Sequence, residues 1–191
     1  MKRWRAPFIR MTMLIAVFFA IWVWAAKDDL TGQARIVDGD SLEISGTKIR
    51  IYGIDAPELG QSCLDRTGAT YACGRLAQRH MEKVAKGRVT CESIETDRYG
   101  RNVAICYAGD TDLGAAMVSS GWARAFLSYS LRYASEEQAA RKARRGLWDG
   151  DFDDPWAFRE DGVQDDLIAI VWRWLMENWR WLLEQVFRTG V

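Results

Sequence analysis

The fold is decided by the stretch IVDGDSLEISGTKIRIYGIDAPE, residues 36–58. Its β-branched residues favour strands, and Ser45-Gly46 near its centre is typical of a turn between two strands. Five acidic residues and one arginine lie in the same stretch, although aspartate packs poorly on a pleated sheet surface. We therefore expect a β-hairpin whose charged residues serve a purpose other than packing.

The carboxylates of this hairpin are candidates for a metal site. A turn near Ser45–Thr47 would bring the region of Asp40 close to residues 52–55, so that Asp40, Asp55 and Glu58 gather at one rim. Carboxylates without counter-charges raise one another's pKa. A hard cation such as Ca²⁺ removes this cost, because it accepts carboxylate and carbonyl oxygens in loose geometry.

Two arginines point to a phosphate-bearing substrate. Arg50 lies in the same hairpin, and Arg101 ends a second turn, DRYGR, at residues 97–101. Guanidinium groups bind phosphate oxygens bidentately, whereas carboxylates repel them. Carboxylates, a metal and arginines together predict hydrolysis of phosphodiester bonds.

Residues 34–150 are predicted to form one domain. Strand patterns with hairpin turns come early, and helical patterns follow at residues 74–87, 111–121 and 135–148. About five short strands with three helices suit an α+β, mainly β architecture, namely a small closed OB-like barrel with helices packed outside it.

Charge limits the class of ligand. The chain carries 26 basic and 26 acidic side chains, so it lacks the large positive excess of a protein that coats duplex DNA. Any contact with nucleic acid must therefore be local and made by a few placed arginines.

The N-terminus predicts export. Four basic residues precede an uncharged apolar run from Met11 to Ala26, and this pattern is typical of a signal peptide. The run is slightly short for a spanning helix, so residues 1–26 are either a cleaved signal or, as we prefer, a membrane anchor. The remainder would then face the periplasm or the cell exterior, held at the inner membrane.

Four cysteines agree with export. An even number after an export signal indicates two disulfides, with three possible pairings. In the hairpin of residues 88–107, a turn between Arg98 and Tyr99 places Cys91 directly across from Cys106, within reach of a disulfide. Cys63 and Cys73 would then close a loop. Zinc is the competing interpretation, but the chain has one histidine and no CxxC motif.

The C-terminal part has two predicted segments. Residues 151–163 form an acidic, proline-interrupted stretch that we interpret as a linker. Residues 164–188 place their polar residues on one stripe of a tryptophan-rich amphipathic helix. This helix could lie on a membrane surface, join two copies in a homo-oligomer, or fold back on the barrel.

The motifs VDGDSLEI, RIYGIDAPE, DRYGR and GLW, in this order within residues 34–149, resemble the staphylococcal nuclease (thermonuclease) family. Each motif alone has a plainer interpretation, DGD as a turn and Arg50 or Arg101 as a solvated side chain. The resemblance implies the OB-like barrel and Ca²⁺-dependent hydrolysis of single-stranded DNA and RNA to 3′-phosphate products.

The resemblance also assigns roles to residues. It implies that Asp40, Asp55 and the backbone carbonyl of Ala56 bind Ca²⁺, and that Glu58 orients or activates the attacking water. Arg50 and Arg101 match the catalytic phosphate-binding positions, and Tyr99 matches a tyrosine that helps to hold a phosphate.

The resemblance is incomplete at three positions. Ser41 replaces a common threonine, and Ala56 replaces a threonine of the best-known member. Leu127 falls where that member carries a base-stacking aromatic residue. Tyr129 is the nearest substitute, and this leaves the base preference open.

A second function class stays open. OB-like barrels also bind oligonucleotides or oligosaccharides without cutting them. The alternative is therefore a non-catalytic binding module in an envelope polysaccharide assembly.

Overall fold

A computed structural model describes residues 29–159, 171–172 and 174–176. The predicted signal or anchor, residues 1–26, lies outside these residues, as does most of the predicted helix 164–188. Within the described residues, no helix combines the length and the apolar character needed to cross a bilayer.

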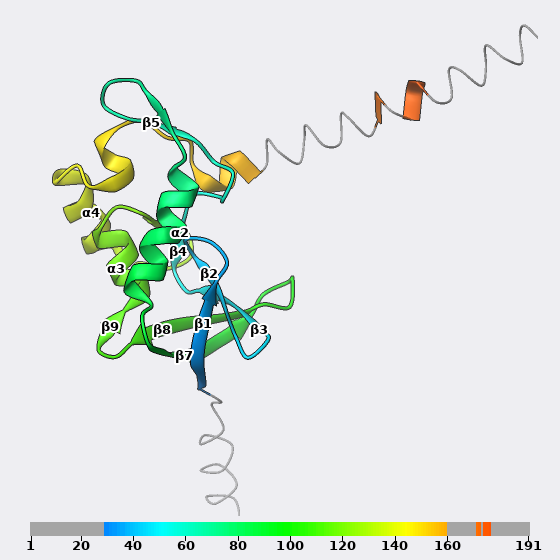
Figure 1. The fold of residues 1–191 in the computed structure, drawn as a ribbon, viewed down its shortest axis with the longest axis vertical. Helices are drawn as coiled ribbons and strands as arrows, with labels where there is room; N and C mark the ends of the chain where they lie inside the picture. The colour runs from blue at the N-terminus through cyan, green and yellow to red at the C-terminus, as the bar shows by residue number, and fades with distance from the viewer. Residues whose placement is uncertain (1–28, 160–170, 173, 177–191) are drawn as a thin grey trace, which may run out of the picture.

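A closed five-stranded barrel forms the body of the domain, as the sequence predicts (Figure 1). The main sheet runs in the order β3-β2-β1-β7-β8-β9, and a parallel pairing of β3 with β8 closes it into a barrel. The barrel strands are β1 (Leu30–Ile36), β2 (Ser41–Ile44), β3 (Thr47–Ile51), β7 (Arg88–Thr96) and β8 (Asn102–Ala108). The first strand thus begins at Leu30, four residues before the predicted boundary.

Short strands form further pairs outside the five barrel strands. β9 (Thr111–Asp112) extends β8, and β4 (Ile54–Asp55) pairs with β10 (Arg124–Ala125). β5 (Cys63–Leu64) pairs with β6 (Thr70–Tyr71). The pairing with β10 fixes β4, which directly precedes Ala56 and Glu58.

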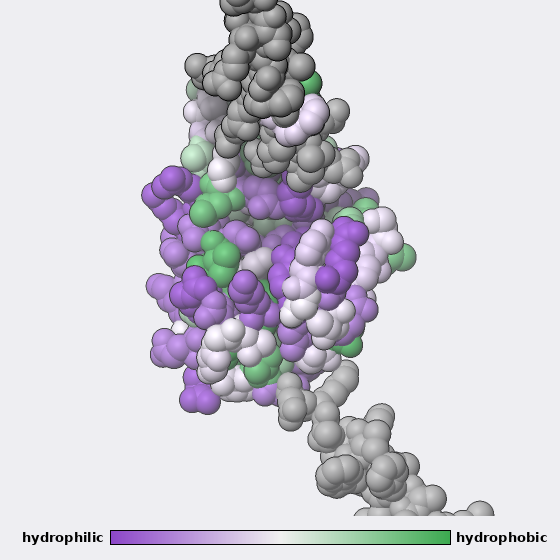
Figure 2. Space-filling model, turned by 90° about the vertical axis from the view of Figure 1, so that its right-hand side faces the viewer, coloured by the Kyte–Doolittle hydropathy of each residue, from purple (hydrophilic) through white to green (hydrophobic). Residues whose placement is uncertain are grey.

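Helices lie together beside the barrel (Figure 1). They are α2 (Cys73–Val84), α3 (Leu113–Ser119) and α4 (Ala134–Lys142), followed by the 3₁₀ helix η1 (Gly146–Asp149). The core between them and the barrel is aliphatic, and it includes Leu42, Ile44, Ile49, Ile51, Val89, Met81, Leu113 and Met117. The face shown in Figure 2 is mainly hydrophilic, as expected for the outside of a single core.

The hairpin of β2 and β3 turns at the predicted residues. Ser45 and Gly46 have positive φ angles of 51° and 83°, the left-handed backbone that tight two-residue turns require. The chain is interrupted before this hairpin, since β1 ends at Ile36 and β2 starts at Ser41. The break allows Gly39 to pack closely, since a Cβ there would lie 2.6 Å from the Cβ of Ala56.

Both predicted disulfides are present. Cys91 pairs with Cys106 across β7 and β8, in the register predicted from the turn. A register shift between Ser93 and Glu95 changes the pairing only nearer the turn. The second disulfide, Cys63–Cys73, closes the loop between β5 and α2, and none of the cysteines is free.

Residues 151–159, placed in the predicted linker, lie against the domain. Asp151 exchanges two backbone hydrogen bonds of 2.8 and 2.9 Å with Leu64. Phe152 packs on the small cluster around the Cys63–Cys73 disulfide. Residues 155–159 are helical, so this stretch follows a defined path across the surface.

Candidate active site

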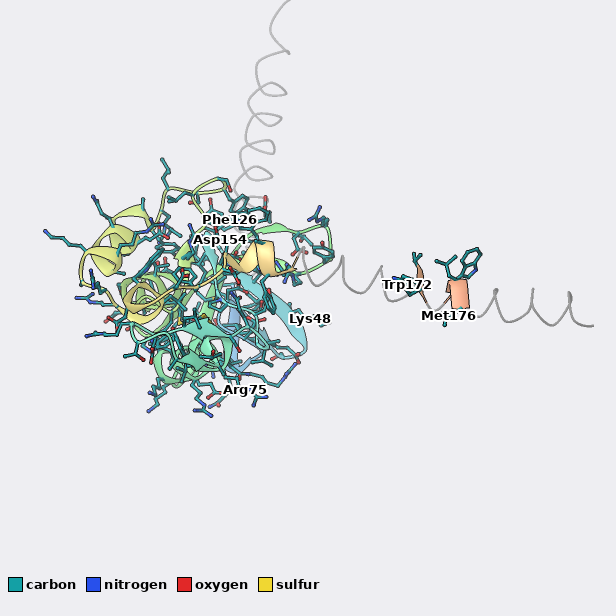
Figure 3. All side chains as sticks on the ribbon, turned by 90° about the horizontal axis from the view of Figure 1, so that it is seen from above. Lys48, Arg75, Phe126, Asp154, Trp172 and Met176 are labelled. Atoms are coloured by element: carbon teal, nitrogen blue, oxygen red, sulfur yellow. A yellow bond between two sulfur atoms is a disulfide. The ribbon has the colours of Figure 1, made fainter. Side chains whose placement is uncertain are left out.

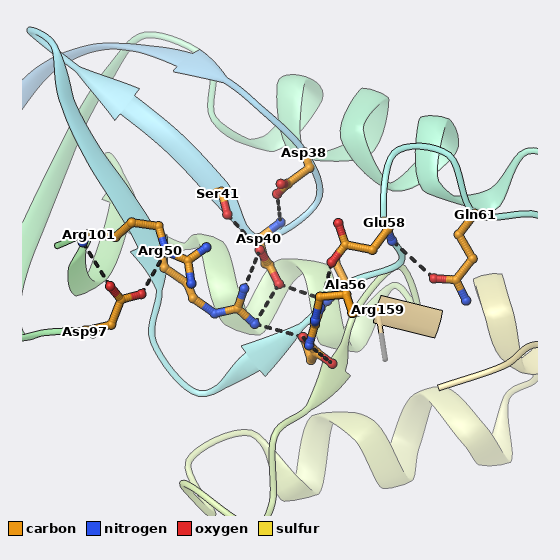
Figure 4. Close-up of polar contacts among 11 residues, drawn as sticks. Asp38, Asp40, Ser41, Arg50, Ala56, Glu58, Gln61, Asp97, Arg101 and Arg159 are labelled. Atoms are coloured by element: carbon orange, nitrogen blue, oxygen red, sulfur yellow. Dashed lines mark hydrogen bonds and ion pairs between the residues drawn. The ribbon is translucent and has the colours of Figure 1, made fainter. Parts of the chain in front are cut away.

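Asp40 and Asp55 meet at one arginine (Figure 4). Arg50 donates from Nη1 to Asp40 Oδ1 at 3.2 Å and from Nη2 to Asp55 Oδ1 at 2.8 Å. Its Nη2 also lies 3.1 Å from Asp40 Oδ2. Both aspartates are 4% exposed, so the structure brings together the two predicted metal carboxylates and one predicted phosphate-binding arginine.

The hairpin geometry explains this meeting. Ser41 pairs with Arg50 across β2 and β3, and the Ile51 N–H donates to the Asp40 carbonyl at 2.8 Å. Asp40 therefore lies one residue beyond the register position opposite Arg50. Asp55 reaches the same place because β4 turns back beside β10.

Further donors hold the Asp40 carboxylate. Ser41 donates its hydroxyl to Asp40 Oδ1 at 2.9 Å, and the Ala56 N–H donates to Oδ2 at 3.2 Å. The contact of Ala56 with this site is thus made by its N–H, while the prediction assigns its carbonyl to a metal. Asp38 Oδ1 accepts a 3.0 Å hydrogen bond from the Asp40 N–H. The DGD sequence therefore forms a turn, as its composition predicts, and also contributes Asp40 to the site.

Burial sets the charge balance. Burial and the neighbouring Asp40 charge raise the pKa of Asp55, although Arg159 and Arg50 act in the opposite direction. Burial would lower the pKa of Arg50, but the charges of Asp40 and Asp55 outweigh it and raise that pKa. Burial and the Asp40 charge also raise the pKa of Asp38 to about 7. The site therefore carries a surplus of acidic groups that need positive partners.

Glu58 lies beside this pair and shares Arg159 with Asp55. Among the described residues, no three acidic, histidine or cysteine side chains group closely enough to hold a metal ion. A second guanidinium binds two of the acids: Arg159 Nη1 lies 2.7 Å from Glu58 Oε1, and its Nη2 lies 3.0 Å from Asp55 Oδ1. The oxygens present are still hard ligands of the type that Ca²⁺ prefers.

Arg101 and Tyr99 lie in the turn between β7 and β8. Arg101 Nε donates to Asp97 Oδ2 at 2.7 Å, and Asp97 also accepts the backbone N–H groups of Tyr99 and Arg101. Tyr99 is 71% exposed, and the Arg101 guanidinium lies 5.6 Å from its ring centroid. Because Val103 pairs with Arg50 in the parallel closure of the barrel, this turn lies next to the carboxylate pair.

One cleft joins these groups. Its volume is about 590 Å³, and its lining includes Asp40, Arg50, Glu58, Tyr99, Arg101 and Arg159. Asp55 lies beneath this surface and lines a smaller neighbouring pocket. The predicted site residues thus converge on one concave surface, of a size that fits a small ligand or a chain segment.

Aromatic side chains form one wall of the cleft. Phe126 and Tyr129 line it, with ring centroids 5.9 Å apart, and Tyr52 lies 5.2 Å from Tyr129. Tyr129 donates its hydroxyl to Glu95. Leu127, in contrast, lines the smaller pocket beside Asp55. Tyr129, the predicted substitute for the base-stacking aromatic residue, thus lines the cleft, whereas Leu127 does not.

Two residues of this site were missed by the sequence interpretation. Arg159 was placed in the linker, although it is the one basic residue among residues 146–172, and that isolation was a usable signal. Gln61 is 1% exposed; its Oε1 accepts the Glu58 N–H at 3.1 Å and its Nε2 donates to the Asp153 carbonyl at 2.8 Å. Nothing in the sequence marks Gln61, because both of its partners are backbone groups.

Comparison with known proteins shows which family this chain resembles and which of the site residues the match covers. The family described as "Staphylococcal nuclease homologue" matches residues 48–150. That range includes Arg50, Asp55, Glu58 and Arg101, whereas Asp40 precedes it and Arg159 follows it.

Individual relatives extend the match. A micrococcal nuclease of Shigella flexneri is 30% identical over 178 residues, covering 83% of this chain and 95% of that protein. An uncharacterized endonuclease of Escherichia coli O157:H7 is 29% identical over 160 residues, covering 79% and 98%. The succinoglycan biosynthesis protein ExoI of Rhizobium meliloti is 38% identical over 128 residues, covering 64% of this chain and 66% of that protein.

Proposed function

This chain belongs to the staphylococcal nuclease family of hydrolytic nucleases, and from that premise we propose a Ca²⁺-dependent endonuclease that cuts DNA and RNA. One observation carries the proposal. Two buried carboxylates, Asp40 and Asp55, share Arg50 at a cleft that Glu58 and Arg101 also line. A structural ion pair alone would not require the second acid and the second arginine.

The two aspartates would hold the metal, together with the carbonyl of Ala56. Their chemistry fits, because they are hard oxygen donors, and burial together with the Asp40 charge raises the pKa of Asp55. Bound there, Ca²⁺ would supply positive charge against a phosphate oxygen.

The other residues act on the substrate. Arg50 and Arg101 bind oxygens of the scissile phosphate and stabilise the extra negative charge of five-coordinate phosphorus. Glu58 accepts the proton of the attacking water, since a carboxylate within reach of the water can act as general base. Breaking the bond from phosphorus to the 5′ oxygen then leaves a 3′-phosphate.

The test uses the full chain, with detergent if its apolar N-terminus requires it. A 5′-labelled single-stranded oligonucleotide and a matched RNA are incubated with Ca²⁺ or with a chelator. Arg50→Ala is expected to lower turnover about 100-fold, as the loss of one donor to a developing charge does. Lys48→Ala is the control, because Lys48 is an exposed cation of the same strand. Full activity in chelator, or equal activity of the Arg50 and Lys48 variants, contradicts the proposal.

We further propose that the protein is exported and held at the inner membrane by residues 1–26. Support comes from Lys2, Arg3, Arg5 and Arg10 ahead of an apolar run. The mass of the mature protein and its distribution between membrane and periplasmic fractions test this. A cytoplasmic protein with its N-terminus intact argues against export.

A binding function in envelope polysaccharide assembly is the second candidate. It is favoured by the similarity to a protein named for succinoglycan biosynthesis and by the general use of OB-like barrels as binding modules. Oligosaccharide binding without cleavage of either nucleic acid in Ca²⁺ would select it over the nuclease.

A further inference from the structure

Arg159 lies outside the matched family region and reaches into the candidate active site from the C-terminal segment. Its guanidinium bridges two acids, Asp55 and Glu58. Nη2 lies 3.0 and 3.3 Å from the two oxygens of Asp55, and Nη1 lies 2.7 Å from Glu58 Oε1. Its charge is therefore placed on one proposed metal ligand and on the proposed general base (Figure 4).

The position of Arg159 is fixed by contacts of the segment that precedes it. The segment before it is fixed at three successive points: the paired backbone of Asp151 and Leu64, the Asp153 carbonyl bound by Gln61, and the ion pair of Asp154 with Arg124. From Asp154 the chain continues as a helical turn, with the Phe158 N–H bonded to the Asp154 carbonyl at 3.0 Å. The guanidinium follows directly on this turn.

Close packing strengthens the same attachment. Gly150 approaches Leu64 so closely that a Cβ would lie 1.9 Å from the Leu64 carbonyl oxygen. Phe152 packs with its ring 5.0 Å from that of Trp148. One of the anchors, Leu64, lies on the loop that the Cys63–Cys73 disulfide closes, and Phe152 packs on the cluster around that disulfide.

Charge counting shows what Arg159 does at this site. Asp40, Asp55 and Glu58 carry three negative charges, and Arg50 offsets one of them. Arg159 offsets a second, with its side chain 38% exposed. A divalent cation on Asp55 would have to share or displace that contact, because two cations competing for one carboxylate repel each other.

We propose that Arg159 is an intramolecular cation that competes with Ca²⁺ for Asp55 and holds Glu58 in an ion pair, so that the docked segment 151–159 opposes Ca²⁺ binding until Ca²⁺ displaces Arg159. This rests on the proposed function, since it assigns Ca²⁺ to the same carboxylates. Linkage makes the effect reciprocal: the docked segment weakens Ca²⁺ binding by the factor by which Ca²⁺ weakens docking.

The first measurement is Ca²⁺ affinity by isothermal titration calorimetry on the full chain. Arg159→Ala is expected to bind Ca²⁺ about 10-fold more tightly than the wild type, within the usual range of such couplings. Arg159→Lys keeps the charge but cannot span two carboxylates, so its affinity should lie between the two. The control is Arg75→Ala, which removes an exposed arginine of α2 that lies well apart from Asp154 in Figure 3.

The second measurement is hydrogen exchange of the backbone amides of residues 156–159, which follow Pro155. Ca²⁺ is expected to accelerate it in the wild type, because displacement of Arg159 releases the helical turn. An electrostatic effect without undocking would leave this exchange unchanged, and would leave Arg159→Lys equal to the wild type; either result overturns the proposal.

The outcomes distinguish a failure of the proposed Ca²⁺ competition from a failure of the proposed nuclease function. A wild type that neither binds Ca²⁺ nor cuts nucleic acid refutes both. A wild type that cuts in Ca²⁺, with unchanged affinity in Arg159→Ala, refutes only the competition. If that variant also loses turnover at saturating Ca²⁺, Arg159 is a substrate-binding arginine instead.

Discussion

Gly74, the second residue of α2, supports the loop that carries Glu58. A Cβ on Gly74 would lie 1.8 Å from the Glu58 carbonyl oxygen. Because that neighbour is backbone, the loop itself must retreat by more than about 1 Å to reach an acceptable contact of 3.0 Å. Gly74→Ala therefore moves the proposed general base through a residue that never touches the substrate.

The expected magnitudes follow from two opposing effects. Overpacking costs about 1–3 kcal/mol, while replacing a helical glycine by alanine returns about 1 kcal/mol. A net loss of about 1 kcal/mol in unfolding free energy is expected, and a displacement of about 1 Å at a catalytic group lowers turnover about 100-fold. The relative loss of turnover should thus be far larger than the relative loss of unfolding free energy.

Urea unfolding and turnover of a labelled oligonucleotide in Ca²⁺ measure the two effects. The matched control is Gly60→Ala in the same loop, where a Cβ would meet nothing within 4 Å and the backbone is not left-handed. Equal turnover of the two variants would refute the argument that α2 positions Glu58 by direct backbone contact.

Three further predictions use other features. Asp38→Asn should stabilise the chelator-treated protein by more than about 1 kcal/mol at pH 8 and little at pH 4, because a folded pKa of about 7 means that stability is lost as the pH rises from the unfolded value of 3.8 towards 7; urea unfolding at both pH values checks this, and equal shifts contradict it. Replacing Cys63 and Cys73 by alanine should cost about 2–3 kcal/mol, since the disulfide closes a loop of sequence separation 10, and should speed proteolysis after Asp151; an unchanged cleavage rate would show that the loop does not hold the segment. Ca²⁺ at 100 times its dissociation constant should stabilise the protein by about 2.7 kcal/mol, seen as a higher Tm that Asp40→Asn abolishes, and a Tm independent of Ca²⁺ would count against the metal site.

Features set by local pattern were predictable from the sequence. The turn at Ser45-Gly46 fixes the hairpin that joins Asp40 to Arg50, and the DRYGR turn fixes the register that pairs Cys91 with Cys106. In both cases the partners lie within about fifteen residues, so the geometry of one hairpin suffices.

Features set by distant packing were not predicted. Arg159 meets Asp55 across 104 residues of chain, and no periodicity links the two. The acidic composition of residues 151–163 indicates a solvated linker, but Gln61 and Leu64 satisfy its backbone and hold it on the domain. The sequence predicted that Asp40, Asp55 and Glu58 gather at one rim, but not that Arg159 supplies a counter-charge there from another part of the chain.

The parallel pairing of β3 with β8 has a consequence for the order of folding. It joins Arg50 to the strand that begins next to Arg101, although these arginines lie 51 positions apart. Long-range pairings of this kind form late, because the chain must close a large loop before any contact stabilises it. A nascent or half-folded molecule therefore carries the proposed site residues without holding them in one cleft. Under the proposed function, nucleic acid near the site of synthesis is not cut until β3 and β8 have paired.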